Sequence, residues 1–337
     1  MTATARAHPN IALVKYWGKS DTGFNLPATG SLSMTLDVFP TTTTVTLAPE
    51  RDADVFTLDG VVRTGIPATR VTRLLDVVRA AAGSTAAAVV TSHNTVPSAA
   101  GLASSASGFA ALAAAAAAAY GLDLDERGLS RLARRGSGSA ARSVPGGFAL
   151  WHAGDDEHSV AERIAAPELA MVIGIVDRAE KPVSSREAMN RTALTSPYYP
   201  AWVTSTAETL EAACEACRDG DVTRLGRIAE TNALRMHAAI QACDPPIRYL
   251  TPASVELFDR IARLRADGVE AYGTADAGPN VVAVCRPHDA AAVAAVLADV
   301  TEVVVAGVGP GVRLLDDTER IDTERIDTER LDGAEPA

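Results

Sequence analysis

A run of small residues and hydroxyls occupies residues 96–108, Val-Pro-Ser-Ala-Ala-Gly-Leu-Ala-Ser-Ser-Ala-Ser-Gly, just before an alanine-rich stretch. Small side chains let a backbone approach a ligand closely, and the free N–H groups at a helix start favour an anion. Ser104, Ser105 and Ser107 could add hydroxyl donors or a magnesium ligand. The segment lacks the G-x-x-x-x-G-K-[ST] pattern of a Walker A loop and is not a dinucleotide fingerprint. It predicts phosphate binding, and a serine-rich helix cap is the alternative.

Two lysines stand four residues apart in residues 10–21, Asn-Ile-Ala-Leu-Val-Lys-Tyr-Trp-Gly-Lys-Ser-Asp. The chain has only three lysines, Lys15, Lys19 and Lys181, among 31 Lys plus Arg. In a strand, positions 15 and 19 would face the same side, with Trp17 between them. A compact ammonium suits point-charge contact with phosphate oxygens. The segment therefore predicts a strand that presents phosphate contacts, although a general bias toward arginine would also make lysine rare.

Two further residues could act on a substrate. Asp276 begins Asp-Ala-Gly-Pro-Asn, where it could serve as a base, although the same residues are good turn formers. Arg142 follows a Gly/Ser run from residue 136, where a planar guanidinium could clamp a carboxylate with two hydrogen bonds. The alternative for Arg142 is a surface arginine, one of several in residues 131–142.

The elements that would position these residues follow from periodicity. Alternation over residues 31–62 predicts antiparallel strands, and apolar spacing over 67–82 predicts a helix. Further elements are expected as strands at 86–92, 147–152, 169–176, around 272, 281–285 and 301–306, and as helices up to 120, at 125–135, within 184–267 and at 290–297. This order predicts an α+β chain with two lobes that meet near residue 180.

Composition narrows the class of protein. A chain of 337 residues with 47% hydrophobic residues can bury a large core, and its net charge of −11 argues against a general nucleic-acid binder. The C-x-x-C at Cys214 and Cys217 has no second pair or nearby histidine, so helix packing is expected rather than zinc or redox chemistry. The apolar run 109–120 is too short to span a bilayer, and the first residues lack the apolar core of a signal peptide. We expect a cytoplasmic protein without nucleic-acid or membrane partners, ending in a disordered, charged tail of Asp-Thr-Glu-Arg-Ile/Leu repeats at 316–337.

Together, these motifs resemble the GHMP kinase superfamily and, within it, the diphosphomevalonate decarboxylase family. The resemblance rests on 10–21, on the loop at 96–108, on Ser-Gly-Ser-Ala-Ala-Arg-Ser at 137–143 with Gly-Gly-Phe-Ala-Leu-Trp at 146–151, and on 276–280. Residues 184–189 are a weaker match, and the whole covers residues 7 to 315 in order. It implies a two-lobed GHMP-kinase fold, with an N-terminal lobe like ribosomal protein S5 domain 2 (1–180), a ferredoxin-like C-terminal lobe (181–315) and the active site in the cleft between them.

The implied reaction converts (R)-5-diphosphomevalonate and ATP to isopentenyl diphosphate, ADP, phosphate and CO2, with Mg²⁺ and in a homodimer. The resemblance implies catalytic roles for Asp276, Arg142, Asn10 and Ser105. It implies substrate contacts from Tyr16, Lys19, Ser137, Ser139, Arg142, Ser185, Arg186 and Met189. It implies ATP contacts from Pro97, Ser98, Gly101, Ala103, Ser104, Ser105 and Ser107, with Ser105 as the candidate Mg²⁺ ligand.

Alternatives remain open at this stage. Residues 184–189 could simply be an N-capped helix with Glu187 at its third position. A phosphomevalonate decarboxylase or a mevalonate 3-kinase would carry similar motifs, and so would an ATP-binding relative without turnover. The joint presence of Tyr16, Lys19, Arg142 and Asp276 favours the diphosphate decarboxylase.

Overall fold

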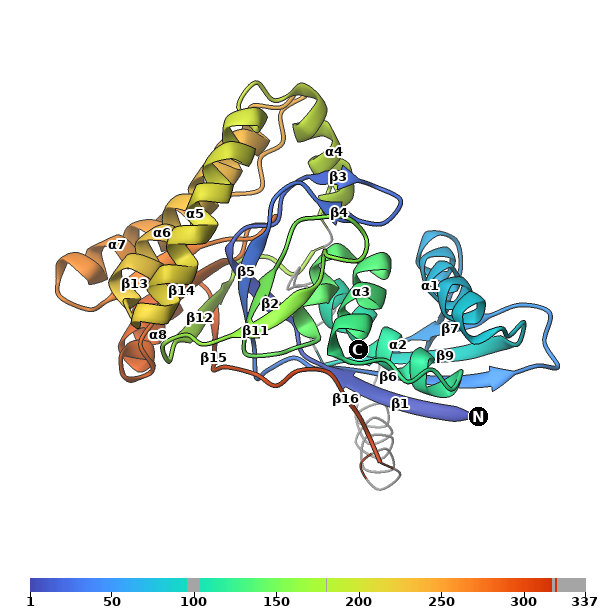
Figure 1. Cartoon of the computed structure of the whole chain (residues 1–337). Coiled ribbons are helices and arrows are strands. Elements are labelled where there is room, and N and C mark those ends of the chain that lie inside the picture. Colours follow the sequence, from blue (N-terminus) through green and yellow to red (C-terminus); the bar gives the residue numbers. More distant parts are fainter. Residues whose placement is uncertain (96–103, 180, 317–318, 320–337) are drawn as a thin grey trace, which may run out of the picture.

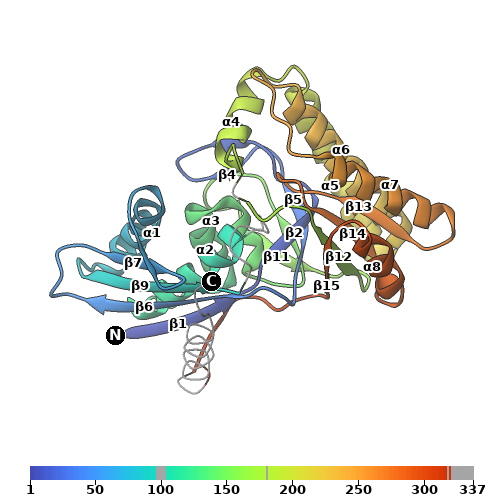
Figure 2. The ribbon, with the colours of Figure 1, turned by 180° about the vertical axis from the view of Figure 1, so that it is seen from behind.

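The computed structural model describes residues 1–95, 104–179, 181–316 and 319, with only the backbone of residue 104. These residues form three main β-sheets and a set of α-helices, so the predicted α+β class is confirmed (Figures 1 and 2). The predicted loop residues Pro97, Ser98, Gly101 and Ala103, and nearly all of the repeat tail, lie outside the described residues.

The first sheet has the strand order β16-β1-β6-β9-β7-β8. Its strands are Thr2–Ala7 (β1), Thr41–Ala48 (β6), Val55–Leu58 (β7), Val61–Arg63 (β8), Ala87–Asn94 (β9) and Arg313–Leu314 (β16). Helix α2 (Ser104–Ala119) packs on β1 and β6, and its alanines other than Ala118 are buried because their small side chains let the helix approach the sheet. Helices α1 (Ile66–Ala82) and α3 (Glu126–Gly136) pack beside α2.

The second sheet is smaller and lies next to the predicted site. Its order is β11-β10-β5-β2, with bounds Ala161–Ile164, Phe148–Trp151, Ser31–Thr35 and Asn10–Val14. A short hairpin of β3 (Lys19–Asp21) and β4 (Leu26–Pro27) follows β2 along the chain. A 3-10 helix, η1 (Gly138–Ser143), leads from α3 toward β10.

The third sheet, in the order β13-β14-β12-β15, carries helices on both faces. Its strands are Ala271–Thr274, Val281–Cys285, Ala170–Ile175 and Glu302–Ala306. Helices α5 (Tyr199–Asp219) and α6 (Val222–Gln241) pack on one face, while α7 (Pro252–Ala266) and α8 (Ala290–Ala298) pack on the other (Figure 1). The remaining elements are α4 (Ser185–Thr195) and the short η2 (Pro287–Asp289). Because β12 belongs to this sheet, the sheet begins before the lobe boundary that we expected at residue 180.

One core cluster joins the second and third sheets. It contains Leu13 and Met34 from the second sheet, Met171 and Ile173 from the third, and apolar residues of α5 and α6. The loop after β13, which carries Asp276, is therefore held in a fixed relation to β2 and the lysine-containing segment that follows it.

The predicted continuous strand through residues 15–19 is wrong. Strand β2 ends at Val14, and the next strand begins only at Lys19. The backbone N–H of Lys15 donates to the Asn232 side chain of α6, at 2.7 Å, instead of to a neighbouring strand. Gly18 has a φ of 106°, and a Cβ there would lie 2.0 Å from the Tyr199 hydroxyl, so the chain turns sharply at a position that only glycine fits. Lys15 and Lys19 are thus placed by separate elements.

Other expectations can be checked on the same residues. The cysteines at 214 and 217 are unpaired on α5, where Cys217 is buried in the core. In the described part of the chain, no helix is both long and apolar enough to cross a bilayer.

Candidate active site

Asp276 lies in the loop between β13 and β14, and its carboxylate is anchored by a buried lysine. Its Oδ1 accepts a hydrogen bond from Lys15 Nζ at 2.7 Å. The Asp276 side chain is 44% exposed whereas that of Lys15 is 1% exposed. Lys15 Nζ also donates to the carbonyl of Ala12, at 2.7 Å. The ammonium therefore supports the carboxylate from inside the protein and leaves its other side open.

The charges around Asp276 keep it ionised. Burial acts to raise the pKa of this carboxyl, but the positive charge of Lys15, followed by those of Arg142 and Lys181, outweighs burial and lowers the pKa below its usual value. Burial in turn lowers the pKa of Lys15, and Asp276 opposes that change. At neutral pH the pair is a carboxylate facing open space with an ammonium behind it.

Arg142 is held by η1 in a buried polar cluster. Its side chain is 3% exposed, its Nε donates to Asn10 Oδ1 at 3.1 Å, and its Nη1 donates to Ser31 Oγ at 2.7 Å. Asn10 is fixed in turn, because its Nδ2 donates to Ser143 Oγ at 2.8 Å and to the Ser139 carbonyl at 3.1 Å. Asn10 and Arg142, two of the predicted catalytic residues, are thus in contact. Burial lowers the pKa of Arg142 to about 10, which leaves it charged at neutral pH.

Tyr16 follows Lys15 and reaches the beginning of η1. Its ring packs edge-on against Trp151, with 4.8 Å between centroids. The Tyr16 hydroxyl is buried and has no hydrogen-bond partner among the described residues, and a Cβ at Gly138 would approach it to 2.7 Å. A buried hydroxyl without a partner is rare in proteins. This one is available to a ligand that enters beside Ser137.

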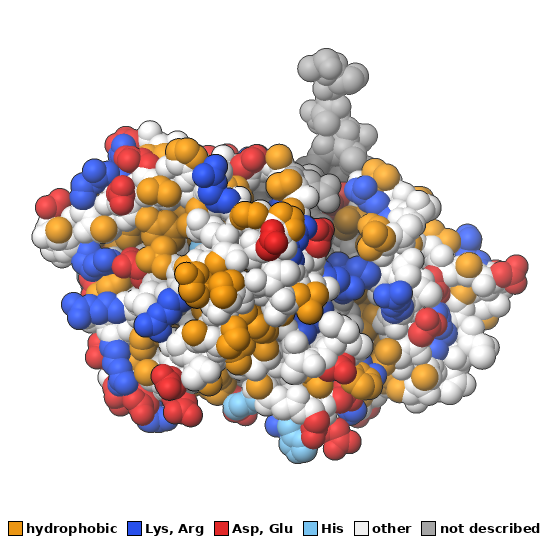
Figure 3. All heavy atoms as spheres, turned by 90° about the horizontal axis from the view of Figure 1, so that it is seen from above, with side chains coloured by type: hydrophobic (Ala, Val, Ile, Leu, Met, Phe, Trp, Pro, Cys, Tyr) orange, Lys and Arg blue, Asp and Glu red, His pale blue; other side chains and the backbone are white. Residues whose placement is uncertain are grey.

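Three cations from different elements gather near the hairpin. Burial, followed by the charges of Arg186 on α4 and Arg70 on α1, lowers the pKa of Lys19 to about 8. Burial and Arg186 likewise lower the pKa of Arg70 to about 10. Mutual repulsion of this kind is relieved by an anion. Seen from above, Lys and Arg side chains are exposed near the middle of this face, between the part that contains α1 and the rest of the molecule (Figure 3).

The beginning of α2 meets η1 through two predicted hydroxyls. Ser137 Oγ donates to Ser105 Oγ at 3.4 Å, and Ser105 is exposed. Ser107 differs, because it is fully buried and its hydroxyl lies 2.7 Å from that of Thr41. The geometry thus supports Ser105 as a phosphate or metal contact and offers no support for Ser107 in that role.

A cavity of about 180 Å³ opens beside Ser105. Its walls come from α1, α2 and the first sheet, and they are Thr41, Phe56, Leu58, Pro67, Arg70, Val71, Ser92, Asn94, Ser105, Gly108, Phe109 and Leu112. The Arg70 guanidinium lies 4.6 Å from the Phe109 ring centroid. A mostly apolar slot with an aromatic wall next to a phosphate loop can accept a flat aromatic base.

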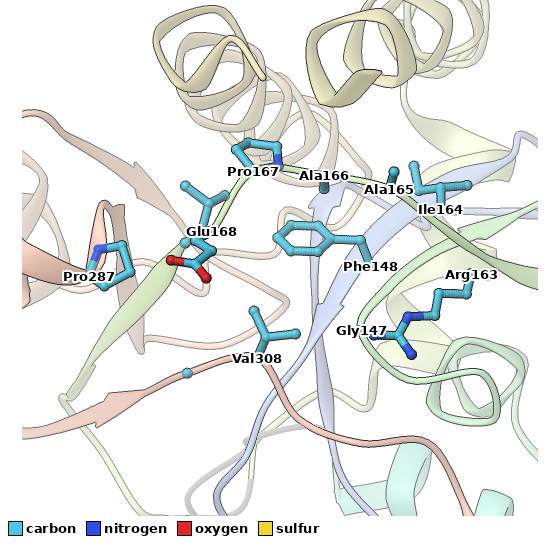
Figure 4. A pocket seen from close by; sticks show the side chains of 12 residues that line it. Gly147, Phe148, Arg163, Ile164, Ala165, Ala166, Pro167, Glu168, Pro287 and Val308 are labelled. Atoms are coloured by element: carbon cyan, nitrogen blue, oxygen red, sulfur yellow. The ribbon is translucent and has the colours of Figure 1, made fainter. Parts of the chain in front are cut away.

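A larger cavity of about 470 Å³ lies elsewhere and contains none of the predicted site residues. Figure 4 shows Phe148, Pro167 and Val308 along it, with Arg163 and Glu168 at its sides. The candidate active site is therefore not in the larger cavity.

Helix α4 carries the remaining predicted contacts, with mixed outcome. Ser184 caps the helix by accepting from the N–H of Glu187 at 3.2 Å, so the capping alternative is confirmed for this residue. Lys181 Nζ donates to Ser185 Oγ at 3.1 Å, and Lys181 is close enough to Asp276 for their charges to interact. Met189 is 8% exposed and packs in the core with Trp17 and Trp202, so nothing in its surroundings favours a substrate contact.

The sequence missed part of this arrangement. The rarity of lysine pointed to Lys15 and Lys181, but not to their closeness to Asp276. Arg70 and Ser31 gave no signal, because an arginine on an amphipathic helix and a serine on a strand are ordinary surface residues in a sequence.

Comparisons with known proteins agree with this geometry. The family described as diphosphomevalonate decarboxylase-like N-terminal domain matches residues 7–161, and the mevalonate 5-diphosphate decarboxylase C-terminal domain matches residues 171–311. A diphosphomevalonate decarboxylase of Ganoderma lucidum is 36% identical over 83% of this chain and 77% of its own length. A phosphomevalonate decarboxylase of Haloferax volcanii is 33% identical over 95% of this chain and 100% of its own length.

A solved structure, MDDEF in complex with MVAPP, AMPPCP and magnesium, has a TM-score of 0.90 and 44% identity. The alignment covers 94% of this chain and 99% of that chain. The expected two-lobed GHMP-kinase fold is confirmed by this match.

Proposed function

Because this chain belongs to the diphosphomevalonate decarboxylase family, we propose that it converts (R)-5-diphosphomevalonate and ATP to isopentenyl diphosphate, ADP, phosphate and CO2. The observation that carries the proposal is the Asp276 carboxylate, which is open on one side, ionised, and influenced by the charges of Lys15, Arg142 and Lys181. The reaction needs such an anion beside a hydroxyl and such cations for two phosphate groups and a carboxylate.

Asp276 would accept a hydrogen bond from the C3 hydroxyl of the substrate and align its oxygen with the γ-phosphorus of ATP. The low pKa of Asp276 makes it a weak base. A weak base is sufficient, because phosphoryl transfer passes through a loose transition state in which the nucleophile needs little deprotonation. The hydroxyl proton passes to Asp276 as the new phosphorus–oxygen bond forms and ADP leaves.

Arg142 would hold the substrate carboxylate. When the C3 phosphate leaves with the electron pair of the carbon–oxygen bond, C3 becomes electron-deficient. The bond between C2 and the carboxylate then breaks, and its electron pair forms the new carbon–carbon double bond as CO2 departs. Asn10 and Ser31 keep the guanidinium in one orientation through hydrogen bonds of 3.1 and 2.7 Å, so the carboxylate is held where this bond can align with the departing phosphate.

The diphosphate of the substrate would lie among the Lys19, Arg70 and Arg186 cations. The unpartnered Tyr16 hydroxyl and the hydroxyls of Ser137, Ser139 and Ser185 would add donors. Met189 would contribute only through packing.

ATP would bind along 96–108, with its base in the cavity lined by Phe109 and its phosphates near Ser105 and Arg70. The hydroxyl oxygens of Ser105 and Ser137 suit Mg²⁺, which usually binds through phosphates and few protein ligands. Among the described residues there is no group of three or more His, Cys, Asp or Glu that could hold a metal alone. When bound, the ion would neutralise charge on the phosphate oxygens.

A second candidate is decarboxylation of 5-phosphomevalonate, which is favoured by the similarity to the Haloferax volcanii phosphomevalonate decarboxylase. A mevalonate 3-kinase would consume ATP without releasing CO2. The test is incubation with ATP, Mg²⁺ and each of mevalonate, 5-phosphomevalonate and 5-diphosphomevalonate, with CO2 and ADP measured together. Equal release of CO2 and ADP from the diphosphate alone supports the proposal. ATP consumption without CO2 would refute it.

The proposal also includes the expected cellular location, oligomeric state and lobe boundaries. We place the enzyme in the cytoplasm as a homodimer, with lobes at 1–180 and 181–315 and a solvated tail at 316–337. Analytical ultracentrifugation at micromolar concentration would test the dimer, and limited proteolysis would test the tail.

A further inference from the structure

Asn25 lies in the β3–β4 hairpin, in a conformation and environment unusual for a turn residue. Its φ is 55°, in the left-handed region that asparagine adopts more readily than most residues. Although turn side chains normally point into solvent, Asn25 is only 4% exposed. The side chain is therefore directed into the protein.

The amide of Asn25 uses both of its ends. Its Oδ1 accepts from Lys19 Nζ at 2.6 Å. Its Nδ2 donates to the carbonyl of Arg134 at 3.1 Å and to that of Arg135 at 2.9 Å. These carbonyls belong to the last turn of α3, where backbone acceptors lack partners within the helix. One side-chain amide thus caps a helix and orients an ammonium.

This contact places Lys19 beside the segment that follows α3. The helix ends at Gly136, and Ser137 comes next in the chain. The carbonyl end of a helix attracts a cation, so the position suits an ammonium. One of the three ammonium N–H groups is used on Asn25, and two remain for phosphate oxygens.

The surrounding charges would move Lys19 away if it were not held. Arg70 on α1 and Arg186 on α4 both repel it. The guanidinium groups of Arg134 and Arg135 are paired with Asp156, and as donors they cannot accept a hydrogen bond from Lys19 in any orientation. The Asn25 carbonyl oxygen therefore opposes this local repulsion.

We propose that Asn25 is a positioning residue for the diphosphate half of the active site, where it holds the Lys19 ammonium against the end of α3 and beside Ser137. This inference rests on the proposed function, because it takes Lys19 as a contact of the substrate diphosphate.

The kinetic test compares Asn25→Gly with Phe24→Ala. Glycine accepts the positive φ, so the variant removes the amide and keeps the backbone. Phe24 lies in the same hairpin and meets α3 through the Arg135 guanidinium, 4.8 Å from its ring centroid. We expect Asn25→Gly to raise KM for diphosphomevalonate about tenfold with kcat within about twofold, and Phe24→Ala to leave both unchanged. An unchanged KM in Asn25→Gly, when Lys19→Met raises KM, would overturn the proposal. Equal effects of the two hairpin variants would also overturn it.

A second measurement does not depend on turnover. Because the chain has three lysines, ¹⁵N-lysine labelling gives three side-chain signals, and Lys→Met variants assign them. Loss of the acceptor in Asn25→Gly should lower the pKa of Lys19 further below about 8, whereas the carboxylate in Asn25→Asp should raise it. The signals of Lys15 and Lys181 should not move. A Lys19 titration identical in all three proteins would refute the contact.

The kinetic test and the lysine titration distinguish failure of the proposed function from failure of the proposed role of Asn25. If the wild-type enzyme releases no CO2 from diphosphomevalonate, the proposed function fails while the titration still decides the role of Asn25. If Asn25→Gly does not fold, as judged by circular dichroism, Asn25→Asp takes its place. That variant keeps an oxygen for Lys19 but lacks the two N–H groups and should raise KM at least as strongly.

Discussion

Replacing Lys15 by methionine is the sharpest perturbation of the proposed mechanism. Methionine fills a similar volume but removes the ammonium that lies 2.7 Å from Asp276 Oδ1. The Lys15 ammonium has the largest effect among the groups that lower the pKa of this carboxyl. Burial raises that pKa, and without Lys15 only the charges of Arg142 and Lys181 would oppose the effect of burial. The pKa of Asp276 should therefore rise. An opposite charge at this range favours the ionised carboxylate, so removing it disfavours ionisation, although the 44% exposure of Asp276 moderates the effect.

The consequence appears in the pH dependence of kcat/KM. Asp276 must be ionised to accept the hydroxyl proton, so activity falls as the pH drops through its pKa. In Lys15→Met the acid limb should move to higher pH, and the plateau should fall about tenfold because a hydrogen bond to a charged group is lost. The assay is CO2 release from saturating ATP and varied diphosphomevalonate, with the pH series extended below the ordinary aspartate pKa of about 3.9 because the pKa of Asp276 is lowered.

Lys181→Met is the matched control. Lys181 acts on Asp276 through charge alone and donates its own hydrogen bond to Ser185. Its acid limb should shift less than that of Lys15→Met. If Lys15→Met keeps the wild-type acid limb, then either Asp276 is not the required base or Lys15 does not control its charge, and the mechanism would have to be rebuilt.

Three other perturbations test separate parts of the site. Asp276→Ala should abolish CO2 release while an ATP analogue still binds in calorimetry, and turnover at the wild-type rate would remove Asp276 from its role. Lys19→Arg should raise KM for the diphosphate substrate about tenfold, because the guanidinium fork imposes a different geometry on phosphate oxygens; unchanged kinetics would leave this segment with a packing role only. His237→Asn should reduce the decrease in the free energy of unfolding that occurs as the pH falls. Burial and the charge of Lys15 lower the pKa of His237 from 6.5 to about 4 on folding, so between these values the unfolded chain binds more protons and stability falls as pH falls. Urea unfolding at pH 7 and pH 5 should show about 2 kcal/mol less of this loss in the variant, and parallel losses in both proteins would contradict the prediction.

Local pattern predicted much of the fold. Helix α1 buries Val71, Leu74, Leu75 and Val78, the residues that gave its apolar spacing. Strand β1 was missed because its short side chains carry little alternation, and it is held by pairing with β6 and β16. The break after Val14 could not be predicted either, because it depends on Asn232, which is 217 residues away from Lys15 in the sequence.

The same limit applied to the site. Sequence motifs identified Asp276, Arg142 and Asn10, whose residue types suit their chemistry. Their settings depend on partners that are distant along the chain, such as the 261 residues that separate Lys15 from Asp276. A single sequence does not contain such pairings, because each partner alone has an ordinary structural explanation.

The two neighbouring lysines therefore have different physical reasons to be lysine. Lys15 is almost fully buried, and its ammonium donates to both Asp276 and the Ala12 carbonyl. The N–H groups of an arginine lie in one plane, so a guanidinium in this closed space could reach both acceptors only if they lay in that plane. Lys19 is partly open, and its one fixed acceptor, Asn25, leaves two N–H groups for a ligand. The first lysine sets the charge of the group that receives the proton, and the second contributes to binding of the phosphates. Arginine at position 15 should therefore reduce kcat, whereas arginine at position 19 should mainly raise KM.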